Sequence, residues 1–193
     1  MHGCEHYQRR CKIRAPCCNR IFSCHRCHDK DTSSLDDPNE RHKMVSKDVK
    51  QVVCMMCDTE QQAAQICANC GLKMGEYYCG ICKLFDDDNG SKQPFHCSDC
   101  GICRNGGREN TFHCEKCGCC YVIGKHDSDV CLENATKNNC SVCNEYLFDS
   151  YKEVIVVYCG HAFHKDCFPE MFSQHRCPIC FQVSMPRQQP SKD

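Results

Sequence analysis

The sequence predicts a set of small metal-stabilised α+β modules in place of one large hydrophobic core. Twenty-six cysteines and eleven histidines occur among 193 residues, and the spacing Cys-x-x-Cys occurs ten times. That spacing turns two thiolates of one tight turn toward a single tetrahedral Zn²⁺. Leu, Ile, Val and Phe make up only about 17% of the chain, which is too little for an ordinary core. Bound zinc is therefore expected to supply folding energy that apolar burial cannot.

The main alternative for so many cysteines is a secreted disulfide scaffold. Histidines lie inside the cysteine pattern, and disulfides make no use of them. The chain also enters a Cys/His motif at Cys4, without a leader-like segment. We therefore expect reduced thiols and a location in the nucleus and cytoplasm. No apolar run approaches the roughly 18 residues of a membrane helix, so no membrane partner is expected.

The first pattern, in residues 1–70, is irregular and offers twelve ligands, enough for three ions at four each. Within it, the polar stretch 29–50 is predicted to be a mobile loop with a short helix near its end. Adjacent Cys17 and Cys18 can share one ion only if the backbone turns sharply at Pro16. The predicted sets are Cys54, Cys57, Cys67 and Cys70; Cys4, His6, Cys24 and Cys27; and, as the remaining four, Cys17, Cys18, His28 and His42.

The second pattern is a repeat of Phe-His-Cys-x-x-Cys-x-x-Cys at residues 95–103 and 112–120. Successive side chains of an extended segment point to opposite faces, so His96 and Cys97 are not expected to bind the same ion. An interleaved, zinc-linked β-hairpin spiral would complete every site. The predicted sets are Cys79, Cys82, Cys97 and Cys100; His96, Cys103, Cys114 and Cys117; and His113, Cys120, His126 and Cys131.

The third pattern is an ordered series of eight ligands in residues 140–180. Its order and gaps resemble a RING finger with two histidines. Residues 153–158 are rich in β-branched side chains and are predicted to form a strand, and Pro169 is placed near the start of a short helix. The resemblance implies a cross-brace of two ions, with the sets Cys140, Cys143, His164 and Cys167, and Cys159, His161, Cys177 and Cys180.

The rest of the chain also resembles known zinc fingers. Residues 3–7, 15–18 and 24–29 resemble the CHY zinc finger, and residues 76–86 with the double repeat resemble the CTCHY zinc finger. The order CHY, CTCHY, RING is similar to that of the RING finger and CHY zinc finger-containing ubiquitin ligases, which include the animal p53-induced ligase type and plant relatives. The implied modules are CHY at 1–74, CTCHY at 75–137, RING at 138–181 and a disordered tail at 182–193.

The resemblance implies a RING-type ubiquitin-protein transferase, an enzyme without a catalytic nucleophile of its own. Such a protein binds a ubiquitin-conjugating enzyme carrying ubiquitin and orients it for attack by a lysine of a protein substrate, which is then degraded by the proteasome. A transcription factor is one candidate substrate, and residues 1–131 are expected to recognise it. The residues implied in docking the conjugating enzyme are Val142, Met171, Pro178 and Ile179.

Two other functions compete with this interpretation. Phe181 follows the last ligand, where many RING fingers have Arg or Lys, and this favours a non-catalytic zinc scaffold that binds protein partners. A finger array that binds nucleic acid is the third possibility, but the formal net charge is −1 and no long basic stripe is present, so no nucleic-acid partner is expected. Cys11 and Cys119 remain outside the ligand scheme, either as redox-active or as spare buried thiols.

Overall fold

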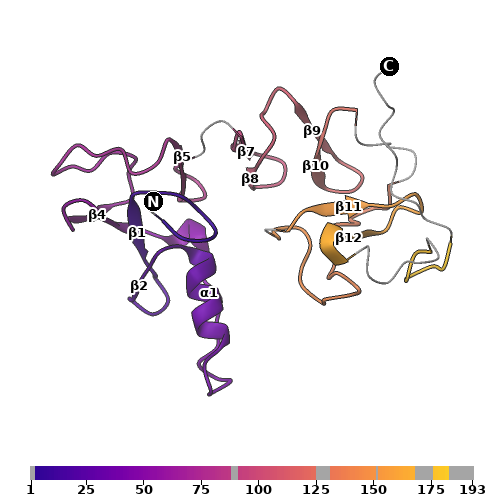
Figure 1. Cartoon of the computed structure of the whole chain (residues 1–193), viewed down its shortest axis with the longest axis horizontal. Coiled ribbons are helices and arrows are strands. Elements are labelled where there is room, and N and C mark those ends of the chain that lie inside the picture. Colours follow the sequence, from indigo (N-terminus) through magenta and orange to yellow (C-terminus); the bar gives the residue numbers. More distant parts are fainter. Residues whose placement is uncertain (1–2, 88–90, 125–130, 151, 168–175, 183–193) are drawn as a thin grey trace. The chain divides into compact units, whose positions relative to one another are not determined.

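A computed structural model describes residues 3–87, 91–124, 131–150, 152–167 and 176–182 of the chain. The predicted helix near Pro169 and the predicted tail beyond residue 182 lie outside these ranges. The chain divides into two compact units, one ending at Phe95 and one beginning at His96 (Figure 1). In both units the elements are short, as expected for small zinc modules with little apolar core.

The first unit is built on a four-stranded antiparallel sheet in the order β2-β1-β3-β4. In β1, Cys11 and Ile13 are buried while Lys12 between them is exposed, which is the period-two pattern of a half-buried strand. The register places Cys11 opposite Cys54 and Ile13 opposite Val52, so the inward faces of β1 and β3 coincide. The strands are β1 (Cys11–Arg14), β2 (Ile21–Phe22), β3 (Gln51–Cys54) and β4 (Glu60–Gln62).

The helix α1 (His25–Ser33) starts directly from a pair of ligand cysteines. Cys24 is its N-cap, and the Cys24 thiol accepts a hydrogen bond from the backbone N–H of Cys27 at 3.3 Å. His28 and Thr32 follow Cys24 at intervals of four, and both are buried on the inner face. The prediction for 29–50 was therefore wrong at its start, which is helical. Near its end there is a single 3-10 turn, η1 (Ser46–Asp48).

Four β-hairpins follow along the chain, each with a ligand pair at its turn or end. The hairpins join β5 (Tyr77–Cys79) to β6 (Leu84–Asp86), β7 (Phe95–Cys97) to β8 (Ile102–Arg104), β9 (Thr111–Cys114) to β10 (Cys119–Val122), and β11 (Val154–Val156) to β12 (Ala162–His164). A 3-10 turn, η2 (Lys165–Cys167), follows β12. The strand β11 lies within the predicted strand 153–158, which confirms that prediction.

One backbone feature recurs after the paired cysteines. The residue that follows the second cysteine has a positive φ, for example 73° at Gly71, 58° at Asn144 and 59° at Phe181. Its N–H donates to the carbonyl of the first cysteine, at 3.0 Å for Gly71 and 2.7 Å for Phe181. This tight turn aims both thiols at one point. Gly and Asn adopt it readily, whereas an aromatic residue such as Phe181 does so at a steric cost.

The core of the second unit is shared between the repeat and the RING segment. Cys114, Cys117 and Ala135 pack in one buried cluster with Leu147 and Phe163. Leu147 is 2% exposed and Phe163 is fully buried. Apolar burial is therefore continuous across residue 138, where the sequence alone suggested a module boundary.

Candidate metal centres

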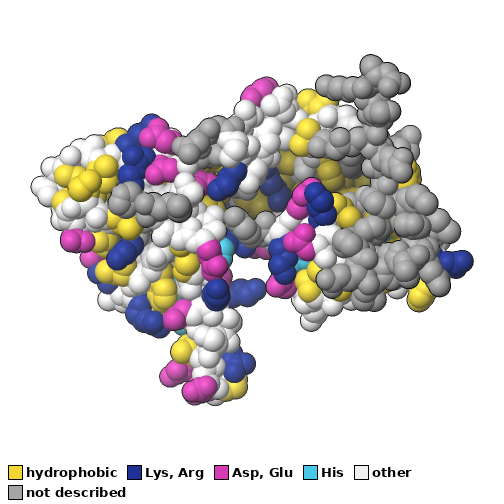
Figure 2. All heavy atoms as spheres, in the orientation of Figure 1, with side chains coloured by type: hydrophobic (Ala, Val, Ile, Leu, Met, Phe, Trp, Pro, Cys, Tyr) yellow, Lys and Arg dark blue, Asp and Glu magenta, His cyan; other side chains and the backbone are white. Residues whose placement is uncertain are grey.

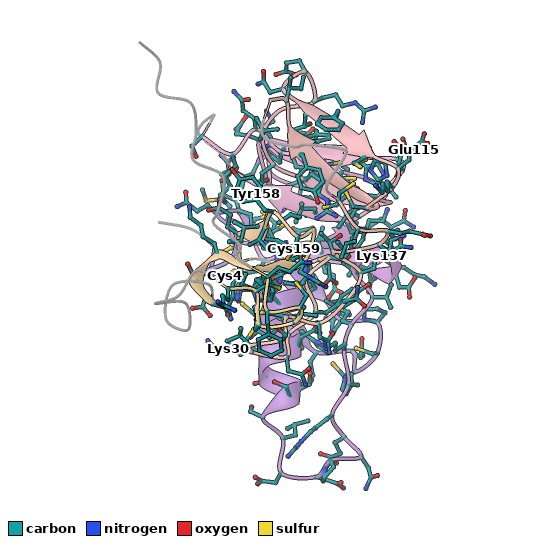
Figure 3. The ribbon with its side chains drawn as sticks, turned by 90° about the vertical axis from the view of Figure 1, so that its right-hand side faces the viewer. Cys4, Lys30, Glu115, Lys137, Tyr158 and Cys159 are labelled. Carbon is teal, nitrogen blue, oxygen red and sulfur yellow. The ribbon has the colours of Figure 1, made fainter. Side chains whose placement is uncertain are left out.

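The N-terminal loop and the start of α1 bring one set of predicted ligands together. The ligand atoms of Cys4, His6, Cys24 and Cys27 all lie within 4.8 Å of one another. The Nδ1 atom of His6 is 3.5 Å from Sγ of both Cys24 and Cys27, and Cys4, labelled in Figure 3, is 3.7 Å from Cys24. Three thiols and one imidazole around one point form a donor set suited to tetrahedral Zn²⁺.

The adjacent cysteines Cys17 and Cys18 do converge on one point. Residues 16–18 form a turn, and the following Asn19 has a φ of 58°, so the backbone makes the sharp change of direction that the sequence analysis required. The ligand atoms of Cys17, Cys18, His28 and His42 lie within 4.8 Å of one another. The distance from Cys17 Sγ to His28 Nε2 is 3.2 Å.

The imidazole of His42 supplies an independent test of whether this set fits a metal ion. Its Nδ1 atom is 2.6 Å from the carbonyl oxygen of Glu40, whereas its Nε2 atom is buried without a hydrogen-bond partner among the described residues. A buried ring nitrogen without a partner is costly unless it binds something. A zinc ion held by the set around His42 would satisfy it.

Asp29 holds the ligand His28 in orientation, a role that the sequence analysis missed. Its Oδ1 atom is 2.8 Å from His28 Nδ1 and accepts the N–H of Met44 at 2.9 Å. A carboxylate on the outer nitrogen of a ligand histidine fixes the ring and increases its basicity. The sequence Cys-His-Asp at residues 27–29 places the acid next to the ligand and could have indicated it.

The ribbon-type set of Cys54, Cys57, Cys67 and Cys70 is brought together as predicted. All four sulfur atoms lie within 4.8 Å of one another. The Cys54–Cys70 and Cys57–Cys67 distances between Sγ atoms are 3.7 and 3.6 Å. Four thiols at such distances, without disulfides, match a tetrahedral zinc site.

The predicted grouping of the repeat was wrong. Cys97 and Cys100 are grouped with His113 and Cys120, not with Cys79 and Cys82. The Cys100–His113 and Cys100–Cys120 contacts are 3.2 and 3.6 Å. The cause is the register of β9 and β10, which pairs His113 with Cys120 and so turns both toward the same side. An ion held by this group would therefore link the β7–β8 hairpin to the β9–β10 hairpin.

The other two predicted sets of the repeat change accordingly. Cys114 Sγ is 3.7 Å from Cys131 Sγ. Cys117, whose Sγ lies 3.4 Å from the Tyr121 hydroxyl oxygen, is beside them. The fourth predicted ligand near them, His126, lies outside the described residues. His96 Nδ1 is 4.0 Å from Cys103 Sγ, and the group that contains these two ligands includes neither Cys114 nor Cys117.

The RING segment groups its ligands in the alternating order that the resemblance implied. In the first group, Cys143 Sγ is 3.2 Å from His164 Nδ1, and Cys140 and Cys167 lie beside them. In the second group, His161 Nδ1 is 3.2 Å from Cys159 Sγ, which Figure 3 labels, and 3.5 Å from Cys177 Sγ. Cys180 lies next to Cys177 in this group.

The thiols of the first RING group compete for ionisation. Burial acts to raise the pKa of Cys140, but the N–H groups of Cys143, His164 and Val142 outweigh it and lower that pKa. Burial, followed by the nearness of Cys143 and Cys140, raises the pKa of Cys167 to about 12. These thiolates repel one another unless a cation lies between them, so the group as a whole is suited to a divalent metal ion.

The predicted docking residues of the RING segment are partly exposed. Val142 is 36% and Ile179 is 47% exposed, and Pro178 is half-buried. Met171 lies outside the described residues. Phe181 is 70% exposed, so its ring is presented to solvent by the strained turn described above.

The visible surface is mixed in charge. Figure 2 shows Lys and Arg side chains interspersed with Asp and Glu side chains over the described parts of this face. None of the helices that the structure describes is long and apolar enough to cross a membrane.

Together, the tight turns at the Cys-x-x-Cys pairs (the knuckle turns), the short hairpins and the converging Cys/His groups define a zinc protein composed of small modules. The CHY zinc finger family matches residues 4–77, and the Ring finger domain family matches residues 138–181. Both families are zinc-binding, so the chain binds Zn²⁺.

Three relatives place the chain more closely. It is 53% identical over 186 residues to the E3 ubiquitin-protein ligase SRFP1 of Oryza sativa, covering 95% of this chain and 68% of that protein. It is 49% identical over 182 residues to the E3 ubiquitin-protein ligase RZFP34 of Arabidopsis thaliana, covering 93% and 62%. It is 40% identical over 185 residues to the Arabidopsis zinc finger protein BRUTUS, covering 93% and 14%. The chain belongs to the family of RING finger and CHY zinc finger ubiquitin ligases, and it spans about two thirds of the first two relatives.

Proposed function

We propose that this chain is a RING-type ubiquitin ligase that promotes transfer of ubiquitin from a conjugating enzyme to lysines of a protein substrate. The observation that carries the proposal is the RING segment itself. Its ligands form two alternating groups, and the apolar Val142 and Ile179, each set between two ligand cysteines, remain exposed. Every RING thiol has a role as a zinc ligand, so none is left to act as a nucleophile. Catalysis would then come from orientation of the two partners.

The exposed apolar residues would dock the conjugating enzyme. Val142 and Ile179 project from the two knuckle turns that open and close the RING, and Pro178 stiffens the second turn. Exposed apolar side chains on a rigid support are the usual anchors of a small protein interface. We assign Met171 to the same surface on sequence grounds alone.

We also propose that eight Zn²⁺ ions are bound. The assignment uses 32 ligands at four per ion. Three sets lie in residues 4–70, one joins Cys97, Cys100, His113 and Cys120, and two lie in the RING. The remaining sets are Cys114, Cys117 and Cys131 with His126, and Cys79, Cys82, His96 and Cys103.

Substrate recognition is assigned to residues 1–131. The first unit exposes several apolar side chains on its zinc-stabilised framework, including Met56 at 68% and Val45 at 59%. Exposed apolar groups on rigid turns suit the binding of another protein. A transcription factor is the substrate class we propose, with the nucleus and cytoplasm as the places of action and proteasomal degradation as the outcome. We propose neither nucleic acid nor a membrane as a partner.

The test is an in vitro autoubiquitination assay across a panel of conjugating enzymes. It is accompanied by single-turnover discharge of the enzyme-bound ubiquitin to free lysine. The proposal expects the chain to speed discharge from at least one conjugating enzyme. After zinc removal the chain should no longer speed it. Binding of conjugating enzymes without faster discharge would instead favour a non-catalytic zinc scaffold, which the absence of a basic residue at position 181 makes the second candidate.

A further inference from the structure

Arg104 lies between a zinc centre of the repeat and the RING segment. It is the last residue of β8, and its Nη2 atom is 3.7 Å from Sγ of Cys100. Three thiolates and one neutral histidine around Zn²⁺ leave that centre with a formal charge of about −1. The positive guanidinium therefore lies next to a negatively charged centre, and the attraction between the two charges stabilises the guanidinium at this place. Its Nε atom is buried without a partner among the described residues, so the hydrogen bonds of this side chain come from its two Nη atoms.

The other end of the same guanidinium holds Phe148, which is 44 residues further along the chain. The Nη1 atom of Arg104 donates to the carbonyl oxygen of Phe148 at 2.7 Å. The guanidinium carbon also lies 4.6 Å from the centre of the Phe148 ring, within the range of a cation–π contact. Arg104 thus fixes both the main chain and the ring of Phe148.

Phe148 belongs to a short loop, residues 147–150, that supports a RING ligand. Leu147 anchors the start of the loop in the core. At its end, Oγ of Ser150 is 2.9 Å from Nε2 of His164, whose Nδ1 faces Cys143 at 3.2 Å. Ser150 is therefore the outer hydrogen-bond partner of a ligand histidine, a contact that typically orients the ring and tunes the metal.

We propose that Arg104 is a positioning residue for the RING, because it holds the loop that keeps Ser150 against the zinc ligand His164. The first RING centre, which contains His164, then depends on Arg104, a side chain that contacts a ligand of a different zinc centre. Val142 lies between the ligands Cys140 and Cys143 of that RING centre, so loosening the centre would also misplace a docking residue. Only this last consequence rests on the proposed ligase function.

The test follows the ligand thiols directly. Full-length zinc-loaded protein is mixed with a chelator and iodoacetamide, and alkylation of each cysteine is followed by peptide mass spectrometry. Arg104→Ala is expected to speed labelling of Cys143 and Cys167 about tenfold, the lower range for loss of an outer-shell contact. Arg108 is exposed, so Arg108→Ala is the matched control. Its cysteines should be labelled at the same rates as those of the unaltered protein. Unchanged labelling of Cys143 and Cys167 in Arg104→Ala would overturn the proposal.

A second set of variants separates positioning from a general loss of structure. Cys54 and Cys57, in the first unit, should keep their labelling rate in Arg104→Ala if the chain is folded. Arg104→Ala also removes the positive charge beside Cys100. Arg104→Lys keeps that charge but cannot hold the Phe148 carbonyl in the same way, so protection from labelling should be closer to normal at Cys100 than at Cys143. Equal restoration at Cys100 and Cys143 would contradict a role through the loop.

The decisive comparison combines Arg104→Ala with Ser150→Ala. If Arg104 acts through Ser150, the double variant should label Cys143 little faster than the more affected single variant. Rate increases that multiply would show independent effects and would also overturn the proposal. Ubiquitin discharge is measured in parallel and should fall in the order of the labelling rates. A chain inactive even when unaltered would refute the ligase function, while the labelling comparison would still decide the role of Arg104.

Discussion

The Sγ atom of Cys100 lies 3.2 Å from Nδ1 of His113, a residue of the following repeat. This contact shows how the repeat builds its metal centres. The two cysteines that open one repeat meet the histidine and the last cysteine of the next. An ion held by this group would tie two hairpins together, so the stability of each hairpin would depend on the ligands of its neighbour.

Replacing His113 should open one particular centre. His113→Ala removes one ligand, so Cys97, Cys100 and Cys120 should become open to alkylation, whereas Cys114 and Cys117 should stay protected. Zinc content should fall by one ion. Peptide mass spectrometry after brief iodoacetamide treatment measures this. Labelling of Cys131 together with Cys120, but not of Cys97, would instead support the grouping that the sequence alone suggested.

Native mass spectrometry should show eight zinc ions in the full chain. Structural zinc contributes roughly 10–16 kcal/mol of apparent binding energy per site, most of it as folding energy in small modules. Chelation should therefore unfold the protein, with loss of dispersion in its amide NMR spectrum. A reproducible count of six or fewer would contradict the ligand assignment, and a folded chelated protein would contradict the role of metal in stability.

Changing the exposed RING residues should impair transfer without loss of metal. Val142→Arg and Ile179→Ala are each expected to slow ubiquitin discharge about five- to thirtyfold, which corresponds to roughly 1–2 kcal/mol of docking free energy. Neither side chain is a ligand, so the zinc count should not change. Met56→Ala, an exposed apolar knuckle residue of the first unit, is the matched control. Normal discharge in both RING variants would place the docking surface elsewhere.

The RING should be more stable with the preceding repeat than without it. Cys114 and Cys117 share a buried cluster with Leu147 and Phe163, and Arg104 holds Phe148. A fragment of residues 96–193 is therefore expected to unfold at a higher temperature than one of residues 132–193, as measured by calorimetry with zinc present. Equal unfolding temperatures would show that the shared cluster adds nothing to RING stability.

Cys11 should be unreactive while the protein is folded. The side chain is 1% exposed, and burial raises the pKa of its thiol to about 11. Because the thiol is mostly protonated at any pH well below its pKa, almost no thiolate is present near neutrality. Iodoacetamide at pH 7.5 should leave Cys11 unlabelled in the zinc-loaded protein and label it after chelation. Rapid labelling of the folded protein would support a redox role.

Spacing and residue type were enough to predict small zinc modules and the three groups of residues 4–70, but not the grouping in the repeat. The pairs separated by two residues indicate tight turns because the local backbone alone brings two thiols to one point. The strand 153–158 was visible for a similar reason, since β-branched residues favour extended backbone locally. The set 54–70 was predictable because its four cysteines lie in one short segment, whereas the two sets of residues 140–180 were implied by the resemblance to a RING finger.

Only the tertiary structure decided how distant ligands combine. The grouping of Cys97 and Cys100 with His113 depends on the register of β9 against β10, which no local spacing reports. The helix from His25 was hidden because its residues are polar and its inner face holds a ligand and Thr32 in place of the usual apolar side chains. The contacts of Arg104 with Phe148 and of Ser150 with His164 join residues 44 and 14 positions apart. Long-range contacts of this kind arise from packing as a whole, so composition and spacing cannot specify them.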